Sequence, residues 1–197
     1  MRNKAIGIIH DEHRSISAVL SGLRSLAQLA RDGKLKPDFA VFRAMIYYID
    51  AFPERLHHPK EDEHLFARLL ARDPGARELV ESLKAEHVSG ARLIRDLEQA
   101  ALAFEQTWPE GAAAFASAVD AYSNFHWSHM RREEQDVIPR AEKALTPEDW
   151  KAIEAAFEGN DDPIADLRTQ DFHTVYQRIL NIAPAPIGLG ERWKPAT

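Results

Sequence analysis

The chain has 197 residues, of which 45% are hydrophobic and 28% are charged, a composition typical of a soluble globular protein with one domain of ordinary size. It contains no cysteine, which excludes disulfides, thiolate metal sites and iron–sulfur clusters. A net charge of -6 and the lack of a dense lysine and arginine cluster argue against nucleic acid or a membrane surface as a partner. No segment resembles a signal peptide or a membrane span, so we expect a cytoplasmic protein.

Apolar residues recur at helical spacing along most of the chain, and alternating strand-like patterns are nearly absent, which predicts an all-α fold. A first helix is predicted over about residues 3–31, with Gly33 just beyond its end as a stop signal. A second helix is predicted over about residues 38–71. Pro53 and Pro59 lie inside it, so we expect a break or a kink near them.

Three further helices are predicted from their start signals. Asp73 and Pro74 read as an N-cap followed by proline at the first helical position, which opens a third helix. The chain restarts after Pro109 for a fourth helix, and Thr146 caps a short fifth helix that ends near Phe157.

The character of the sequence changes after residue 158. Residues 159–197 contain an Ala-Pro-Ala-Pro run and two glycines close behind it, which regular helix does not accommodate. We therefore expect residues 159–197 to form an extended tail. Its Ile187 and Trp193 predict that the tail packs in a groove of the domain or of a second chain, in which case the protein is a homodimer.

The second and fourth helices carry the same short motif. His57-x-x-x-Glu61 aligns with His129-x-x-x-Glu133 at an offset of 72 residues (129 − 57), and each copy reads His-x-x-x-Glu-acid-x-x-apolar-apolar. Such an internal repeat indicates that two similar helical hairpins build the site.

A lone histidine completes each hairpin. His13 and His87, each within an apolar helical stretch, are 74 residues apart (87 − 13). Residues four apart share one face of a helix, so His57 can bind one metal ion while Glu61 reaches a neighbouring one. A set of imidazoles and carboxylates suits iron, manganese or zinc. A buried glutamate without such a partner loses several kcal/mol of hydration. The alternative is that the histidines only pack in the core of a structural bundle.

These motifs resemble those of bacterial hemerythrin-like proteins with the His-His-Glu cation-binding signature, over about residues 5–145. The resemblance rests on His13, His57-x-x-x-Glu61, Glu86-His87 and His129-x-x-x-Glu133-Glu134. It implies an antiparallel up-down four-helix bundle, here as a domain of residues 1–158, around two iron ions with a bridging oxo or hydroxo group. By position, it implies that one iron is bound by His13 and His57, the other by His87 and His129, with Glu61 and Glu133 as bridges. Manganese or zinc are alternatives.

The chain departs from the oxygen-carrying members of that family at one position. Those members have a further histidine four residues after the third-helix histidine, where this chain has Ala91. One iron therefore lacks a nitrogen ligand and is open to water, a small ligand or another side chain. The candidates as additional ligands or neighbours of the site are His10, Tyr122 and His126. We expect His58 to flank the site or to be exposed, and Glu12, Glu86, Asp62 and Glu134 to contact the ligands or the surface.

The resemblance implies a protein that binds dioxygen or a related small ligand, for binding, storage or sensing. The alternatives are a diiron peroxidase or oxidase, which the open position at Ala91 favours, and a protein that handles nitric oxide or iron. We expect a metal- and dioxygen-binding protein rather than an enzyme.

Overall fold

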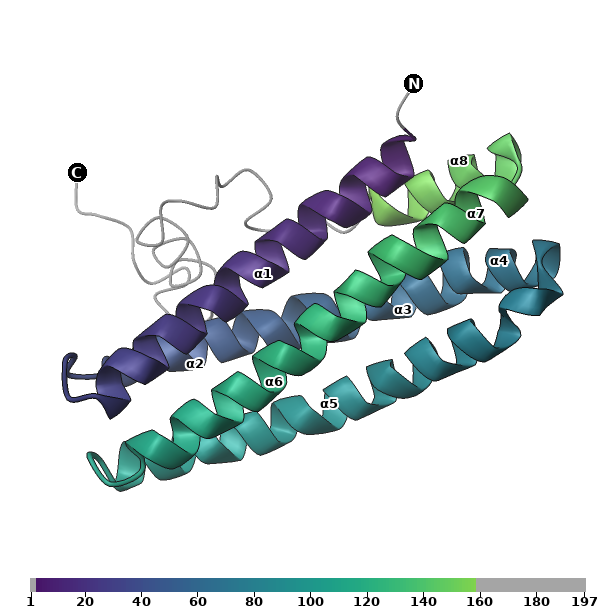
Figure 1. Cartoon of the computed structure of the whole chain (residues 1–197). Helices are drawn as coiled ribbons and strands as arrows, with labels where there is room; N and C mark the ends of the chain where they lie inside the picture. Colours follow the sequence, from purple (N-terminus) through teal and green to yellow (C-terminus); the bar gives the residue numbers. More distant parts are fainter. Residues whose placement is uncertain (1–2, 159–197) are drawn as a thin grey trace, which may run out of the picture.

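The computed structural model describes residues 3–158, and within this range the chain is helical throughout, without a strand (Figure 1). This confirms the predicted all-α class. Its α-helices are α1 (Lys4–Arg31), α2 (Phe39–Ile49), α3 (His58–Lys60), α4 (Ala67–Arg72), α5 (Arg77–Gln106), α6 (Ala112–Arg132), α7 (Ile138–Ala144) and α8 (Pro147–Phe157). The predicted tail at 159–197 lies outside the described residues.

Several of these helices run into one another through segments of a different helical type. Wider π-helical segments connect α2 to α3 (η1, Asp50–His57), α3 to α4 (η2, Glu61–Phe66) and α6 to α7 (η4, Glu133–Val137). The chain is therefore continuously helical from residue 39 to 72 and from residue 112 to 144. Together with α1, α5 and the short α8, these segments give five helical units.

The contacts between these units define a bundle. Helix α6 packs against α1 and α5, α2 packs against α1 and α5, and α8 packs against α1 and η2. Figure 1 shows the long units side by side, with α8 beside the N-terminal end of α1. None of the helices in this part of the chain is long and apolar enough to span a lipid bilayer.

Local signals in the sequence set most of the helix ends. Gly33 has a φ of 67°, which a residue without a Cβ adopts freely, and α1 ends just before it as predicted. Thr146 and Asp149 form a reciprocal capping box at the start of α8. Asp73 caps a 3-10 turn (η3, Pro74–Ala76), and α5 begins only after that turn.

The predicted interruption near Pro53 and Pro59 takes the form of π-helix rather than a break. Pro53 lies within η1, and the backbone N–H of His58 bonds to the carbonyl of Pro53, five residues back. A proline has no N–H and crowds the preceding turn. The wider π-helical turn accommodates both defects, so the helix continues.

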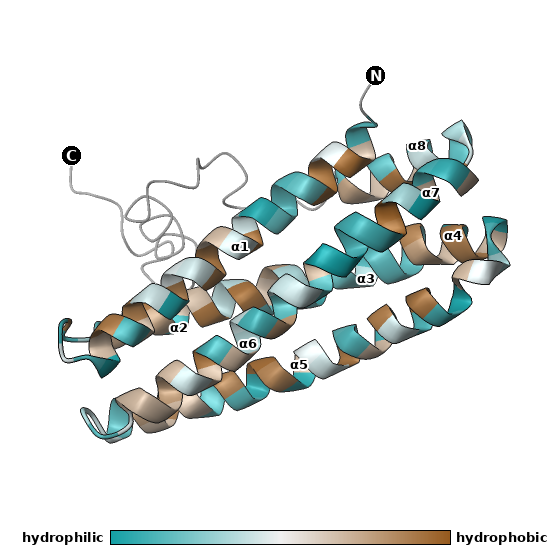
Figure 2. Cartoon of the chain, in the orientation of Figure 1, coloured by the Kyte–Doolittle hydropathy of each residue, from teal (hydrophilic) through white to brown (hydrophobic). Residues whose placement is uncertain are grey.

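The core has two apolar parts with a polar layer between them. Figure 2 shows hydrophobic and hydrophilic residues mixed along each helix, as in helices that bury one face. One part gathers around Leu20, Phe42, Phe104 and Phe115. The other gathers around residues such as Phe66. The layer between them contains most of the buried ionisable side chains: Glu12, His13, His57, His58, Glu61, His87, His126, His129 and Glu133. The fold thus places the chemistry-bearing residues in the interior, between the two apolar parts of the core.

Candidate metal centre

Four histidines from four helical units form two pairs in this layer. His13 on α1 and His57 at the end of η1 have their Nε2 atoms 3.1 Å apart. His87 on α5 and His129 on α6 have their Nε2 atoms 2.9 Å apart. Two nitrogen ligands at right angles on an ion, each at about 2.1 Å, lie about 3 Å apart. Each pair therefore has the spacing of two ligands on one ion.

Two carboxylates lie between the histidine pairs. Oε1 of Glu61 is 3.3 Å from His57 Nε2, and its Oε2 is 3.6 Å from His87 Nε2. Glu133 has the same arrangement: its Oε2 is 3.4 Å from His13 Nε2, and its Oε1 is 3.2 Å from His129 Nε2. Each glutamate thus turns one oxygen toward each pair.

These carboxylate oxygens lack ordinary partners. All four oxygens of Glu61 and Glu133 are buried, and none accepts a well-formed hydrogen bond from the described residues. An unpaired carboxylate in a protein interior loses several kcal/mol of hydration unless a cation or hydrogen bonds replace the water. Orphaned oxygens facing paired imidazoles are therefore a donor set that fits bound metal cations.

The charges of this cluster favour ionised glutamates. Burial alone lowers the pKa of a histidine, but Glu61 and Glu12 outweigh it and raise the pKa of His57 well above its ordinary value. Burial also lowers the pKa of His129, but the charge of Glu133 outweighs burial and raises that pKa to about 10. Burial disfavours ionised Glu133, yet the charge of His129 lowers the pKa of that carboxyl. These opposing charges thus favour ionised carboxylates beside the imidazoles.

The far side of each imidazole is held by a further carboxylate. The Nδ1 atoms donate to acidic side chains in four pairs: His57 to Glu12 at 2.6 Å, His129 to Glu86 at 2.8 Å, His13 to Glu134 at 2.9 Å and His87 to Asp62 at 3.1 Å. Such a contact fixes the tautomer and the ring orientation, which leaves Nε2 for a metal. The acidic residues that we expected beside the site thus lie directly behind the paired imidazoles.

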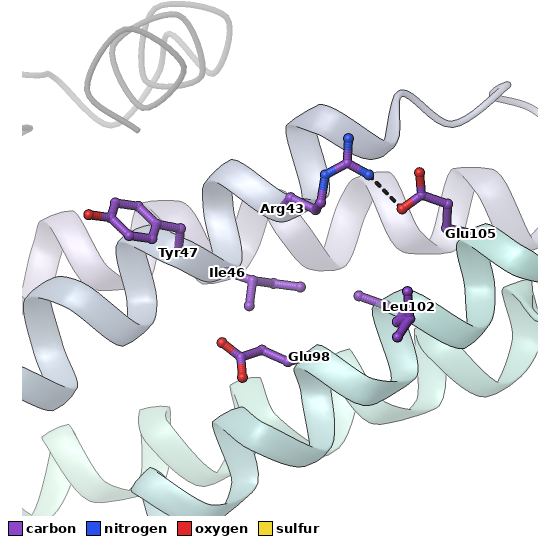
Figure 3. A pocket seen from close by; sticks show the side chains of 7 residues that line it. Arg43, Ile46, Tyr47, Glu98, Leu102 and Glu105 are labelled. Carbon is purple, nitrogen blue, oxygen red and sulfur yellow. Dashed lines mark hydrogen bonds and ion pairs between the residues drawn. The ribbon is translucent and has the colours of Figure 1, made fainter. Parts of the chain in front are cut away.

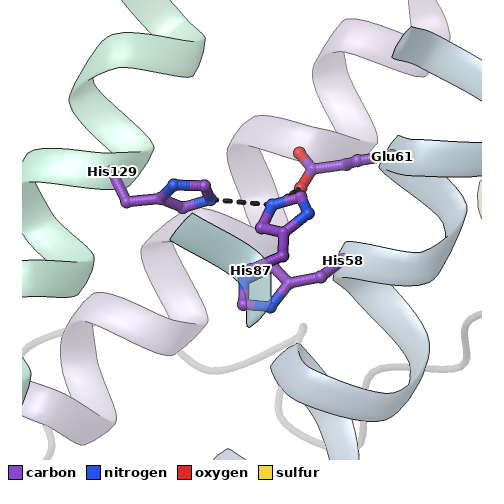
Figure 4. A group of neighbouring side chains, drawn as sticks. All are labelled: His58, Glu61, His87 and His129. Carbon is purple, nitrogen blue, oxygen red and sulfur yellow. Dashed lines mark hydrogen bonds and ion pairs between the residues drawn. The ribbon is translucent and has the colours of Figure 1, made fainter. Parts of the chain in front are cut away.

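His58 is buried at this centre, with 4% of its surface exposed. Its ring stacks on that of His87, with centroids 4.4 Å apart and planes 11° apart. Atoms able to bind a metal on His58, Glu61, His87 and His129 all lie within 4.8 Å of one another (Figure 4). Of the two sequence expectations for His58, the flanking position is the one the structure shows. Burial lowers its pKa to about 4.

The other three candidate residues, His10, Tyr122 and His126, contact carboxylates around the histidine pairs. His10 is 24% exposed, and its Nδ1 is 3.4 Å from Oε1 of Glu134, the partner of His13. The hydroxyl of Tyr122 donates to Glu54 at 2.8 Å, and Nε2 of His126 is 3.2 Å from the same oxygen.

Glu54 is the residue that the sequence analysis missed. Only 4% of its side chain is exposed, although it lies on a charged, proline-containing segment. Burial opposes its ionisation, but His126 and His58 outweigh burial and lower its pKa. One feature of the sequence could have indicated Glu54: it precedes His58 by four residues, the same spacing that separates His57 from Glu61.

Position 91 has a different environment from the one expected. Ala91 is exposed, whereas its neighbour Gly90 is buried on the inward face of α5. The α5 position that faces the interior after His87 is therefore Gly90 and not Ala91, and it carries no side chain that could bind a metal.

A separate pocket lies between α2 and α5, away from the histidines (Figure 3). Apolar side chains such as Ile46 and Leu102 line it, and Arg43 pairs with Glu105 at 2.5 Å across its rim. It contains no histidine and no orphaned carboxylate. Among the described residues the polar layer is therefore the stronger candidate for chemistry.

Comparison with known proteins agrees with this geometry. A family model described as the hemerythrin HHE cation-binding domain matches residues 4–141. That range contains both histidine pairs, both central glutamates and their outer carboxylates. No curated protein sequence matches the chain significantly.

Proposed function

The chain belongs to the hemerythrin HHE cation-binding family, and on that premise we propose that it holds two iron ions and binds dioxygen or a related small ligand at them. Its role would be oxygen binding, storage or sensing, in the cytoplasm. The six proposed ligands are His13, His57, Glu61, His87, His129 and Glu133.

The observation that carries this proposal is the split contact of each central glutamate. Glu61 and Glu133 each turn one oxygen to the His13–His57 pair and the other to the His87–His129 pair. A single ion needs no such division. Two ions do, because a carboxylate between them offsets part of their mutual repulsion.

The proposed scaffold is an antiparallel up-down four-helix bundle. The connection between α1 and α2 covers residues 32–38, and that between α5 and α6 covers residues 107–111. Short connections of this kind favour antiparallel neighbours, and the contacts of α6 with α1 and α5 support such an arrangement.

The residues around the centre orient the imidazoles and exclude water. The carboxylates of Glu12 and Glu86 hold the rings of His57 and His129. The ring of Phe66 stacks on that of His87 at 5.7 Å, and Phe157 meets His57 edge-on at 5.9 Å. Apolar walls of this kind favour a small neutral ligand over an anion. Bound iron would supply the electron density that such a ligand takes up and returns.

A diiron peroxidase or oxidase is the second candidate. The specific observation in its favour is that α5 turns no second histidine to the centre after His87, since Ala91 is exposed and Gly90 has no side chain. A protein that handles nitric oxide or iron would use the same ligands.

Elemental analysis and visible spectroscopy of the purified protein test the proposal. We expect about two irons per chain and an absorption band that bleaches on reduction and returns on exposure to air. Bound zinc or manganese with no iron would contradict it. Sustained peroxide consumption at this centre, without reversible bleaching, would favour the enzyme.

A further inference from the structure

A second buried polar cluster adjoins the His87–His129 side of the centre. It consists of Glu54 on η1, His58 at the start of α3, and Tyr122 and His126 on α6. All four side chains are at most 5% exposed. Buried polar groups are expensive unless they are satisfied, so a cluster of this size needs an explanation beyond packing.

The carboxylate of Glu54 accepts one hydrogen bond and lies close to the nitrogens of two histidines. Its Oε1 accepts from the Tyr122 hydroxyl at 2.8 Å and lies 3.2 Å from His126 Nε2. Its Oε2 lies 3.4 Å from Nδ1 of His58. The hydrogen bond from Tyr122 on α6 therefore fixes one oxygen of this carboxylate, and the other oxygen lies beside His58.

Helix α5 leaves the space that this carboxylate occupies. A Cβ at Gly90 would lie 3.1 Å and 3.3 Å from the two oxygens of Glu54, and 3.5 Å from Cε1 of His126. These separations are tighter than ordinary van der Waals contact for the oxygens. The carboxylate of Glu54 on η1 thus fills the space that a side chain at position 90 would need.

The arrangement of His58 is similar to that of the four paired histidines, although its Nδ1 lies 3.4 Å from Glu54 Oε2 and forms no hydrogen bond there. Each of those rings has Nδ1 on a carboxylate and Nε2 toward the centre. His58 has Nδ1 directed at Glu54, and a ligand atom within 4.8 Å of those of Glu61, His87 and His129. A carboxylate behind an imidazole is the usual support of a metal-binding histidine.

We propose that His58 is a further nitrogen ligand of the metal ion held by His87 and His129, and that Glu54 is the residue that positions it. This inference rests on the proposed metal centre. The nitrogen missing from α5 is then supplied by the helical unit that also carries His57 and Glu61. The two metal positions become unequal, with three histidines at one and two at the other.

The first experiment compares His58→Ala with the matched control His64→Ala, a partly exposed histidine of the same unit whose Nδ1 contacts Arg68 instead. We expect His58→Ala to lose one of two irons during dialysis against a chelator that wild-type protein withstands. We also expect the X-ray absorption spectrum of iron-loaded His58→Ala, measured before dialysis, to show fewer imidazoles per iron. Added imidazole should restore both the retention of iron and the number of imidazoles per iron, since it can occupy the space left by the His58 ring. His64→Ala should match the wild type.

A second variant tests the positioning residue without emptying space. Glu54→Gln keeps the volume of the side chain and removes its charge. We expect it to lower the affinity of one iron by 10–100-fold, as the loss of a carboxylate behind a metal-binding histidine usually does. It also keeps the test available if His58→Ala does not fold.

The outcomes separate this inference from the proposed function. Wild-type protein that binds no iron would overturn the proposed function. Iron-loaded wild type together with His58→Ala or Glu54→Gln that retain two irons, wild-type affinity and a wild-type absorption spectrum would overturn the role of His58 alone. Loss of iron that imidazole does not restore would show that His58 acts through packing, which also overturns its role as a ligand.

Discussion

At the scale of single residues, the centre alternates acids and bases from the surface inward. Glu12 and Glu86 each contact the outer nitrogen of a histidine, and the inner nitrogens face Glu61 and Glu133. Removing one member leaves its partner buried and unsatisfied. Substitutions here should therefore affect metal content and stability together.

Loss of a paired histidine is the most direct case. We expect His57→Ala and His129→Ala each to lower iron content strongly. Each should also lower the free energy of unfolding by about 2–4 kcal/mol, because a central glutamate stays buried without full compensation. Iron analysis and urea unfolding check both effects. Full iron and full stability in both variants would show that the ligand assignment is wrong.

The outer carboxylates should have a milder effect. Glu12→Gln weakens the support of His57, whose Nδ1 lies 2.6 Å from Glu12 Oε2. We expect iron affinity to fall by about 10–100-fold while the fold remains intact. Competition with a chelator measures the affinity. Glu81→Gln, on the exposed face of α5, is the control and should bind iron as the wild type does.

At the scale of elements, local sequence signals were sufficient to predict helix ends that depend on backbone conformation and capping. Gly33 ends α1, and Thr146 begins α8, as predicted. The π-helical segments were not predicted. A hydrophobic period does not reveal one wider turn, and Pro53 indicates an interruption without indicating its form. Glu54 was missed for the same reason, because its burial depends on that turn and on the gap at Gly90.

The cap of α8 offers a test at this scale. The Thr146 side chain accepts from the backbone N–H of Asp149. We expect Thr146→Ala to lower the free energy of unfolding by about 1 kcal/mol, because an N–H of the first turn loses its partner. Thermal unfolding followed by circular dichroism measures the change. Ser117→Ala, at an exposed position inside α6, should be neutral or slightly stabilising.

At the scale of the whole molecule, the two apolar parts of the core lie on either side of the polar layer. The histidine and glutamate repeat was enough to predict that His13, His57, His87 and His129 point into one interior region with the two glutamates, because helix periodicity fixes the faces; that they bind metal stays a prediction. The sequence does not show which buried side chains complete the set, since His58 and Glu54 meet the centre only through tertiary packing.

The distant core should affect stability without affecting the metal. Phe115 is fully buried between Phe42 and Phe104 in the apolar part away from α8. We expect Phe115→Ala to lower the free energy of unfolding by about 3–5 kcal/mol through the cavity it leaves. Iron per folded chain should stay at the wild-type value. A loss of iron in the folded variant would show that the two regions are coupled.

Metal removal gives the complementary result. Iron that binds only the folded chain adds about 2.7 kcal/mol of stability when its free concentration is 100 times its dissociation constant. We expect a chelator to lower the melting temperature of the wild type. The shift should be smaller for His57→Ala, which has already lost metal. Equal shifts in both proteins would contradict the assignment.

The three π-helical segments have a consequence for how this sequence can change in length. Each holds one more residue per turn than the α-helices on either side, and two of them begin at Glu61 and Glu133. Deleting a single residue from η4 would therefore restore regular α-helical bonding and turn the residues after it only slightly, because the wider turn already absorbs the extra residue. Val137 and Ile138 would then stay on the core side. The same deletion inside α6 would rotate everything after it by about 100°.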